Sequence, residues 1–317
     1  MILKKPNFWQ NRNFISFLLY PLSIVTVIIN FYKKLNVKNY FKIKTICVGN
    51  LNAGGTGKTS LAIELYKLLS IKYKTVFIKK KYSNQKDEYN LLKSRGKIIN
   101  VRNRINALKI AEKNFDLAIL DDGLQQKNVE YDLKIVCINS YEGFGNKFLI
   151  PAGPLRENLY ELKNYDIAFL NGFKKNKKLK QKIKKINNNL KIFDAIYEPI
   201  NLKKFNLQKK ILFFCGIGNP LEFENTLKKF NFKIKEKFIF PDHYNMSDED
   251  IKSLKNLANK RKLSIITTEK DFLRLFIISL FDLKRGPRYL PIINPNSDEA
   301  LYPINLKIMK KKIIKMY

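Results

Sequence analysis

Cysteine, histidine, tryptophan and acidic residues are all scarce in this sequence, and their scarcity excludes several classes of protein. The three cysteines, Cys47, Cys137 and Cys215, are far apart and lie inside apolar runs. This spacing excludes a disulfide framework and a cysteine-based zinc site, and it is typical of a reducing compartment. Hydrophobic residues make up 45% of the 317 residues, which is enough for well-packed cores and excludes a disordered chain. The length suggests two domains.

Only 27 acidic residues accompany 61 lysines and arginines, so the formal net charge is +34. This excess favours anionic partners such as phosphorylated ligands, nucleic acid or an anionic membrane surface. Part of the excess is compositional, because lysines scattered over every surface need no partner. The sequence contains no RNP motif, zinc-finger spacing or compact arginine-rich helix, so we expect no nucleic-acid partner.

An uncharged apolar run extends from Phe14 to Phe31, with basic residues on both sides. Its 18 residues are at the lower limit for crossing a hydrocarbon core of about 30 Å. The run is compatible with a short spanning helix, a helix embedded in the membrane interface or a buried core helix, and Pro21 and Asn30 favour the interface. No small-residue cleavage site follows it, so we expect no cleaved signal peptide. The lysines after it would keep the rest of the chain cytoplasmic.

Short apolar runs alternate with a helix-like pattern along the rest of the chain. Strands are expected at residues 45–48, 75–78, 117–120, 134–138, 167–170, 211–214 and 264–267, and a helix at residues 60–70. This order predicts an α/β fold, with a mostly parallel sheet covered by helices on both faces. We expect an N-terminal membrane-associated segment (1–40), a phosphate-loop domain (41–205) and a smaller C-terminal α/β lobe (206–317). The Lys/Asn-rich stretch 174–206 has a weak core pattern and contains the expected boundary.

The strongest chemical signal is the segment Asn52-Ala-Gly-Gly-Thr-Gly-Lys-Thr59, between an expected strand and an expected helix. Glycines let backbone N–H groups approach phosphate oxygens closely, and the following helix adds its positive N-terminal end. Lys58 can reach the β- and γ-phosphates of a nucleotide, and the Thr59 hydroxyl can ligate Mg²⁺. The residues expected to bind nucleotide are Asn52, Ala53, Gly54, Gly55, Thr56, Gly57, Lys58, Thr59 and Ser60. Asn52 stands where the strict motif has glycine, and the alternative is a glycine-rich turn without a ligand.

Two acids, Asp121 and Asp122, follow the expected strand at residues 117–120. Carboxylates at the carboxyl edge of a parallel sheet lie opposite a phosphate loop, where they can hold Mg²⁺ directly or through water. Because successive side chains of a strand alternate in direction, both acids can face the site only if the chain turns, and Gly123 permits such a turn. Without the phosphate loop, the same three residues would predict a plain loop.

The single histidine, His243, lies in the turn-like segment Phe240-Pro-Asp-His-Tyr244. An isolated histidine is more often a surface or packing residue than a catalyst. Histidine nevertheless suits proton transfer and charge stabilisation near neutral pH.

Six segments occur along most of the chain in one order. They are residues 48–59, Asp121-Asp-Gly-Leu-Gln125, Ile150-Pro-Ala-Gly-Pro-Leu-Arg-Glu157, Gly216-Ile-Gly-Asn-Pro220, Phe240-Pro-Asp-His243 and Thr267-Thr-Glu-Lys-Asp271. In this order they resemble the tetraacyldisaccharide 4′-kinase family, the lipid A 4′-kinases of Gram-negative bacteria. Any one segment can arise by chance, whereas six in the family order are specific.

The resemblance implies transfer of the ATP γ-phosphoryl group to the 4′-hydroxyl of a tetraacylated glucosamine disaccharide 1-phosphate. It implies ATP and Mg²⁺ as cofactors, a P-loop NTPase-like domain, a smaller C-terminal lobe closing over the cleft and an N-terminal membrane-anchoring helix. It also implies a location at the cytoplasmic face of the bacterial inner membrane, with the acylated disaccharide and membrane lipids as partners. We expect the protein to be a monomer.

The family pairs a catalytic aspartate, in a Gly-Asp-Glu stretch, with the histidine of the Pro-Asp-His segment. Here Lys86-Asp-Glu88 matches that stretch, with lysine in place of glycine. The resemblance therefore implies Asp87 as the catalytic base and His243 as its support. The substrate and phosphate environment would include Arg156, Gln125 and Asp242, and the metal environment Thr59, Asp121, Asp122 and Glu157.

The chain departs from the family pattern at two places. The family usually has Arg-Gly-Tyr-Gly after its second strand, where this chain has Lys80-Lys-Tyr-Ser83, so only Tyr82 is kept. Gln126 stands where a histidine usually follows the Asp-Asp-Gly-Phe-Gln motif. These departures bear on the contacts that the usual arginine, glycines and histidine make.

Two other functions are compatible with the residues. A P-loop NTPase could act as a switch or assembly factor without a lipid acceptor, and a lipid-dependent phosphoryl-transfer assay separates it from a kinase. A basic membrane- or nucleic-acid-binding protein without catalysis is the other alternative. The combination of Lys58, Asp87, Asp122 and His243 argues against that second alternative.

Replacing Lys58 by alanine should lower the rate of phosphoryl transfer by a factor of about 100 or more, because a charge-assisted contact to the β- and γ-phosphates is lost. Steady-state kinetics with ATP and the disaccharide lipid measure this effect. Turnover of Lys58→Ala at the wild-type rate would contradict the assignment of the phosphate loop.

Overall fold

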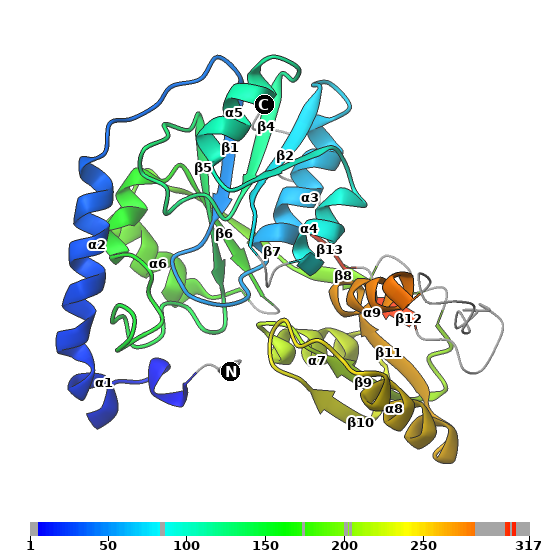
Figure 1. The fold of residues 1–317 in the computed structure, drawn as a ribbon. Coiled ribbons are helices and arrows are strands. Elements are labelled where there is room, and N and C mark those ends of the chain that lie inside the picture. Colours follow the sequence, from blue (N-terminus) through cyan, green and yellow to red (C-terminus); the bar gives the residue numbers. More distant parts are fainter. Residues whose placement is uncertain are drawn as a thin grey trace. The chain divides into compact units, whose positions relative to one another are not determined.

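The computed structural model describes residues 6–82, 86–172, 175–199, 202, 205–282, 302–304 and 306–308 (Figure 1). The chain forms two compact units, the larger one mainly from residues 5–83 and 92–197 and the smaller one mainly from residues 84–91 and 198–307. Residues 84–91 therefore belong with the C-terminal part of the chain, although they lie inside the segment 41–205 expected to form one domain. Of the segment 80–83 that departs from the family pattern, Ser83 lies outside the described residues.

The larger unit contains a seven-stranded sheet in which all neighbouring strands are parallel. Its order is β3-β2-β4-β1-β5-β6-β7. The strands are β1 (Lys44–Gly49), β2 (Thr75–Lys80), β3 (Ile98–Val101), β4 (Leu117–Asp121), β5 (Leu133–Asn139), β6 (Ile167–Asn171) and β7 (Lys191–Ala195). The predicted strands at residues 45–48, 75–78, 117–120, 134–138 and 167–170 are confirmed. The central strands are buried on both faces, so they read as continuous apolar runs rather than as alternating patterns.

Helices cover both faces of this sheet, as the sequence predicted (Figure 1). On one face α3 (Lys58–Leu69) buries Leu61 and Leu65 against the strands. On the other face lie α5 (Arg104–Glu112), α6 (Lys177–Ile186) and the 3-10 helix η3 (Leu159–Asn164).

The stretch 174–206 contributes more to the larger unit than its composition suggests. Asn176 caps α6, and Leu179 and Ile183 bury one side of this lysine-rich helix. The strand β7 then joins the edge of the sheet beside β6. Ile186 also packs against the core, so three apolar residues dock a helix whose other positions are nearly all lysines, and this pattern is easily overlooked in a basic segment.

The N-terminal apolar run forms two short helices rather than one. Asn13 and Ser16 form a capping box at the start of α1 (Phe14–Leu18). Pro21 lies in a 3-10 turn, η2 (Tyr20–Leu22), and α2 (Ser23–Leu35) follows. None of the helices that the structure describes combines enough length and apolar character to cross a membrane.

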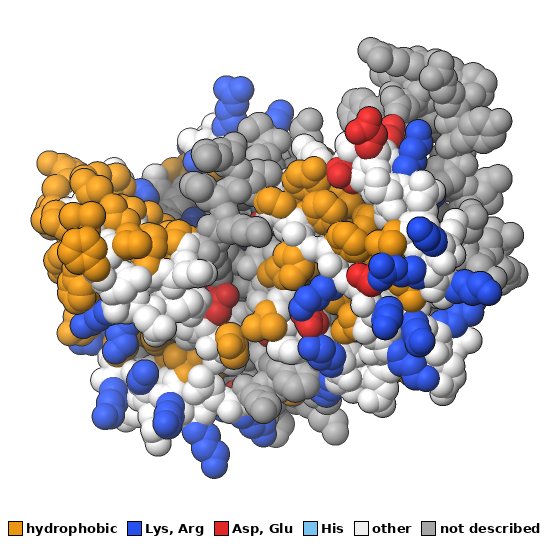
Figure 2. Space-filling view, turned by 90° about the horizontal axis from the view of Figure 1, so that it is seen from below, with side chains coloured by type: hydrophobic (Ala, Val, Ile, Leu, Met, Phe, Trp, Pro, Cys, Tyr) orange, Lys and Arg blue, Asp and Glu red, His pale blue; other side chains and the backbone are white. Residues whose placement is uncertain are grey.

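The apolar side chains of α1, η2 and α2 point away from the protein. Phe14 is 80% exposed and Phe31 is 59% exposed, so the interpretation of this run as a buried core helix is wrong. The large exposed side chains are Phe14, Ile15, Phe17, Leu18, Tyr20, Leu22, Ile24, Val25, Val27, Ile28, Ile29, Phe31, Tyr32 and Leu35. We call this set the apolar helix surface, and it gathers at the left edge of Figure 2.

The smaller unit is built on a parallel four-stranded sheet of order β10-β9-β11-β12. Its strands are β9 (Lys210–Cys215), β10 (Lys233–Ile239), β11 (Ser264–Thr268) and β12 (Tyr302–Ile304), and β8 (Tyr197–Pro199) pairs with β13 (Leu306–Ile308). Alternate residues of β9 face α7 (Pro220–Lys229) on one side, and α8 (Asp248–Lys260) with α9 (Glu269–Asp282) on the other. The predicted strands at residues 211–214 and 264–267 are confirmed.

Candidate functional site

The phosphate loop connects β1 to α3 and depends on the conformation of Gly57. This residue has a φ of +82° and precedes Lys58, the first residue of α3. A Cβ at Gly57 would lie 2.1 Å from the Tyr197 hydroxyl and 2.6 Å from Asn171 Nδ2, so only glycine fits. Asn171 also donates from Nδ2 to the Thr56 carbonyl at 2.5 Å. These contacts therefore restrict the backbone conformation with which the loop enters the first turn of α3. The N–H groups of that turn can bind an anion.

The first two residues of the expected nucleotide-binding segment are engaged within the protein. Asn52 is buried and donates from Nδ2 to the Gly143 carbonyl at 2.9 Å. The backbone N–H of Ala53 donates to the Pro154 carbonyl at 2.8 Å. The asparagine in place of the usual glycine thus anchors the start of the loop, and residues 54–60 form the part that continues into α3.

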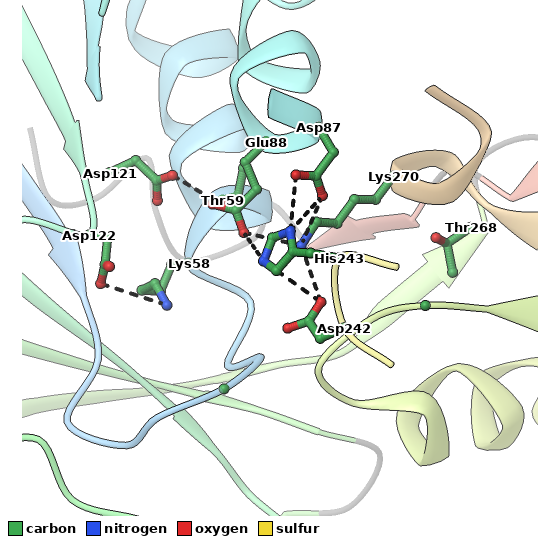
Figure 3. Close-up of polar contacts among 12 residues, drawn as sticks. Lys58, Thr59, Asp87, Glu88, Asp121, Asp122, Asp242, His243, Thr268 and Lys270 are labelled. Atoms are coloured by element: carbon green, nitrogen blue, oxygen red, sulfur yellow. Dashed lines mark hydrogen bonds and ion pairs between the residues drawn. The ribbon is translucent and has the colours of Figure 1, made fainter. Parts of the chain in front are cut away.

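Asp121, at the end of β4, lies beside the start of α3. Its Oδ2 accepts from the Thr59 hydroxyl at 3.3 Å (Figure 3). The same oxygen accepts from Lys79 Nζ at 2.8 Å. Its Oδ1 is buried and has no hydrogen-bond partner among the described residues. The Thr59 hydroxyl and the Asp121 carboxylate are oxygen ligands of the kind that Mg²⁺ prefers, and Mg²⁺ typically keeps water and phosphate oxygens as its other ligands. These two residues therefore fit a magnesium ion.

Asp122 contacts two cations, Lys58 of the phosphate loop and Arg156. It accepts from Arg156 Nη1 at 2.8 Å and lies 3.7 Å from Lys58 Nζ. Although burial raises the pKa of Asp122, the charges of Lys58 and Arg156 hold that pKa well below its usual range. The carboxylate is therefore ionised at neutral pH and fixes both cations at the loop.

The turn after β4 differs from the predicted one. We expected Gly123 to supply the unusual backbone, but Asp122 itself is left-handed, with a φ of 58°. Gly123 is required for space instead, because a Cβ there would lie 2.7 Å from Cys47 Sγ. Arg104, which is buried, donates from Nη2 to the Asp122 carbonyl at 2.8 Å and so supports the turn.

The sequence interpretation missed Lys79 and Arg104 as residues of this site. Lys79 is buried at the end of β2, and the sheet register pairs it directly with Asp121. A lysine in an otherwise apolar strand signals a buried partner, but the partner's identity depends on which strand lies alongside. The sequence shows no corresponding signal for Arg104, which donates to the backbone carbonyls of Asp121 and Asp122 and, at 3.3 Å, to Gln126 Oε1.

Glu157 has a different environment from the metal site expected for it. Its carboxylate is buried and accepts from Lys127 Nζ at 2.7 Å, Gln125 Nε2 at 3.1 Å and the Tyr165 hydroxyl at 3.1 Å. Gln125 also donates to the Asn50 carbonyl at 2.8 Å. Across the described part of the chain, no group of three or more His, Cys, Asp and Glu side chains is arranged to hold a metal ion. A metal role for Glu157 stays a prediction.

The smaller unit brings Asp87 and His243 together, as the resemblance implied. Asp87 lies at the start of α4 (Lys86–Lys93) and is 4% exposed. Its Oδ1 is 3.0 Å from His243 Nδ1 (Figure 3). His243 has a φ of 60°, a conformation that non-glycine residues adopt mainly where the surroundings hold them.

Two cations from α9 also hold Asp87. Arg274 donates to Oδ2 from Nη2 at 2.8 Å and from Nε at 3.1 Å, and Lys270 Nζ lies 3.3 Å from the same oxygen. Burial raises the pKa of Asp87, but the hydrogen bond from His243 and the charges of Lys270 and Arg274 hold that pKa well below its usual range. Asp87 is therefore a firmly ionised carboxylate.

Lys270 joins the remaining acids of this cluster. It lies 3.1 Å from Glu88 and 3.6 Å from Asp242. Burial lowers the pKa of Lys270, but Glu88, Asp87 and Asp242 together raise it. Lys270 belongs to a segment that carried the family resemblance, whereas the sequence interpretation missed Arg274. The spacing of Asp271 and Arg274 on one helix turn was a signal, since a buried acid and base three residues apart support each other.

Comparisons with known proteins agree on one family. A family model described as tetraacyldisaccharide-1-P 4′-kinase matches residues 15–97 and 79–292. The tetraacyldisaccharide 4′-kinase of Pelagibacter ubique is 44% identical over 280 residues, covering 87% of this chain and 89% of the relative. That of Rickettsia canadensis is 34% identical over 331 aligned positions, covering 96% of this chain and 97% of the relative.

The fold also has a counterpart among solved structures. The crystal structure titled the "apo" form of LpxK from Aquifex aeolicus in complex with ATP matches with a TM-score of 0.65 and 22% identity. The match covers 95% of this chain and 96% of that chain. This likeness concerns the fold, and it agrees with the predicted parallel α/β architecture.

Proposed function

The chain belongs to the tetraacyldisaccharide-1-P 4′-kinase family, and on that basis we propose that it transfers the γ-phosphoryl group of ATP to the 4′-hydroxyl of a tetraacylated glucosamine disaccharide 1-phosphate. The observation that carries this proposal is the phosphate loop in which Lys58 lies beside Asp122 and Thr59 beside Asp121. This arrangement presents a cation and a metal-binding oxygen pair next to the N-terminus of α3.

The larger unit supplies the nucleotide site. The backbone of residues 54–59 and the Lys58 ammonium would bind the ATP phosphates. The Arg156 guanidinium contacts the same carboxylate, Asp122, as Lys58 does, so it would lie near the same phosphates. Thr59 and Asp121 would hold Mg²⁺, which supplies neutralisation of charge on the β- and γ-phosphate oxygens. Phosphoryl transfer needs little covalent chemistry from the protein, so positioning and charge compensation account for most of the catalysis.

The smaller unit supplies the proton acceptor, and its geometry favours His243 over Asp87. The two oxygens of Asp87 already accept from His243, Arg274 and Lys270, and the carboxylate is almost completely buried. With Nδ1–H donated to Asp87, the Nε2 lone pair of His243 is left to accept a proton. We therefore assign His243 Nε2 as the acceptor of the 4′-hydroxyl proton while the new O–P bond forms and ADP leaves, with Asp87 holding the imidazole in place.

The apolar helix surface supports a peripheral place on a membrane. Arg12 precedes it in the sequence, Lys33 and Lys34 lie near its C-terminal end, and Lys38 follows. An acylated substrate stays in a bilayer, and an exposed apolar face beside cations suits the boundary between acyl chains and anionic headgroups. We place the protein at the cytoplasmic face of the inner membrane, and a monomeric state stays a prediction from the sequence.

The direct test is the product formed from γ-labelled ATP and the disaccharide 1-phosphate lipid. We expect label to enter the lipid as a 4′-phosphate monoester, and Lys58→Ala to abolish most of this incorporation. Release of labelled inorganic phosphate with no labelled lipid would contradict a kinase and would favour an NTPase that acts as a switch.

Asp87 and His243 should act as one unit in catalysis. Asp87→Ala and His243→Ala should each lower kcat, and the double variant should lose little more than the worse single variant. Added imidazole should restore part of the activity of His243→Ala, because it can replace the missing acceptor, but none of the activity of Asp87→Ala. Asp248→Ala, which changes an exposed aspartate at the start of α8, is the control and should keep the wild-type rate.

Losses that multiply in the double variant would show that the two residues are not coupled. Failure of imidazole to rescue His243→Ala, together with rescue of Asp87→Ala by a small carboxylate such as formate, would return the role of base to Asp87.

The apolar helix surface should hold the protein on vesicles even at high salt. Salt screens the attraction of lysines, worth about 1 kcal/mol each, but leaves apolar burial at about 25 cal/mol per Å² intact. Flotation with vesicles of phosphatidylethanolamine and phosphatidylglycerol should therefore show release by detergent and incomplete release by salt. The triple variant Val25→Gln, Ile28→Gln, Tyr32→Gln, which changes the outward side of α2, should float poorly.

A matched control replaces three exposed apolar residues elsewhere on the larger unit, in the triple variant Ile71→Gln, Ile110→Gln, Tyr141→Gln. This control should float like the wild type. Complete release of the wild type by salt alone, or equal flotation of the two triple variants, would contradict the membrane role of the apolar helix surface.

A further inference from the structure

The segment 148–157 carries Arg156 and lies against the phosphate loop. The Arg156 N–H donates to the Leu51 carbonyl at 2.7 Å, and the Pro154 carbonyl accepts from the Ala53 N–H at 2.8 Å. Asn52 and Leu155 form a β-bridge between the two stretches. The backbone of this segment and the beginning of the phosphate loop are thus bound to each other at three successive positions.

The same segment is held from its other side by α2. Ser23 Oγ donates to the Leu149 carbonyl at 2.9 Å, Thr26 Oγ1 to the Ile150 carbonyl at 2.6 Å, and Asn30 Nδ2 to the Arg156 carbonyl at 2.9 Å. These three residues are spaced so that they share one face of the helix. The helix is therefore turned with its polar side toward the protein and its apolar side outward.

Among the described residues, few other contacts join α2 to the rest of the larger unit. All of its residues are described, and Ser23 is the only buried one. At its end, Lys34 Nζ lies 2.5 Å from Glu161 Oε1. No apolar side chain of α2 is buried in the core. The position of the helix therefore depends on its polar contacts to residues 149–161 and on the environment of its outward face.

Arg156 is the residue where the helix contacts and the phosphate site meet. Its carbonyl accepts from Asn30, while its guanidinium donates from Nη1 to Asp122 Oδ1 at 2.8 Å and to Asn50 Oδ1 at 3.0 Å. One residue therefore separates the amide of a surface helix from the carboxylate that lies beside Lys58. Any restriction on the orientation of α2 acts on the backbone of Arg156.

We propose that Asn30 is a positioning residue for Arg156, and that through this contact lipid binding by α2 and nucleotide binding by the phosphate loop strengthen each other. The inference rests on the proposed association of the apolar helix surface with lipid. Lipid on the outward face restricts α2, which holds the Arg156 backbone and leaves its guanidinium ordered for phosphate. Because coupling between two sites is reciprocal, bound nucleotide strengthens lipid binding by the same factor.

The test measures the Kd for ATP with and without saturating vesicles of phosphatidylethanolamine and phosphatidylglycerol. For the wild-type chain we expect vesicles to tighten ATP binding about fivefold or more. Asn30→Leu keeps the size of the side chain but lacks the donor, and we expect vesicles to leave its Kd nearly unchanged. The lipid affinity of each protein is measured first, so that every variant is compared at its own saturation.

Two further variants complete the design. Asn36→Leu makes the same chemical change just after α2, where the amide donates to the Lys33 carbonyl of the same helix, and it should keep the full vesicle effect. Thr26→Val removes the donor to the Ile150 carbonyl with little change of shape, and it should lose part of the effect. A purely structural role for Asn30 would weaken ATP binding equally with and without vesicles.

The outcomes separate this inference from the proposed function. Equal tightening by vesicles in Asn30→Leu and in the wild type would overturn the inference, and so would a wild-type chain that binds vesicles with no change in its Kd for ATP. Failure of the wild type to bind vesicles would instead contradict the membrane association on which the inference rests. Greater flotation of the wild type with ATP than without it, lost in Asn30→Leu, would support the reciprocal half of the inference.

Discussion

Buried negative charge at the end of β4 is the constraint on which the polar structure of the larger unit depends. Asp121 is fully buried and the Asp122 side chain is only 15% exposed, and an uncompensated carboxylate in such a place would be costly. Lys79 reaches Asp121 from the neighbouring strand, and Lys58 and Arg156 reach Asp122 from the two stretches that border it. The strand β2, the phosphate loop and the segment 148–157 thus each contact one of these two acids.

In the smaller unit, the buried negative charge of Asp87 is likewise compensated by neighbouring side chains. A single buried carboxylate there accepts two N–H groups of Arg274 on one oxygen, and Lys270 and the imidazole of His243 also contact it. An aspartate compensated to this degree is a rigid support and a weak proton acceptor. The difference between the two units lies in what the acids hold: Lys58 and Arg156 in one case, and the imidazole that we propose as the proton acceptor in the other.

Much of this could be predicted from the sequence, because the relevant signals are local. Apolar runs marked the central strands, and the glycines before Lys58 marked the phosphate loop, since both patterns follow from backbone geometry. Contacts that depend on which elements lie side by side could not be predicted. The pairing of Lys79 with Asp121 needs the register of β2 on β4, and the approach of Arg274 to Asp87 joins residues 187 positions apart in the sequence.

The left-handed backbone of Asp122 illustrates the same limit. A glycine follows it, so local rules assigned the unusual φ to Gly123, whereas packing against Cys47 requires that glycine for its small size. For Glu157, the resemblance implied a metal-binding role. Its contacts with Lys127, Gln125 and Tyr165 depend on the folded structure and could not be predicted from the motif. Side-chain roles of this kind are properties of the assembled unit rather than of a motif.

The reversed orientation of α2 has a consequence for which substitutions the helix can tolerate. The lipid tails that we propose as the cover of this face impose no fixed shape, so the outward positions can exchange among leucine, isoleucine, valine and phenylalanine with little effect. The inward positions Ser23, Thr26 and Asn30 must each place a donor within hydrogen-bond distance of one carbonyl. In this helix, therefore, the polar positions are the restricted ones and the apolar positions the permissive ones, which is the reverse of the rule for a helix packed on a core.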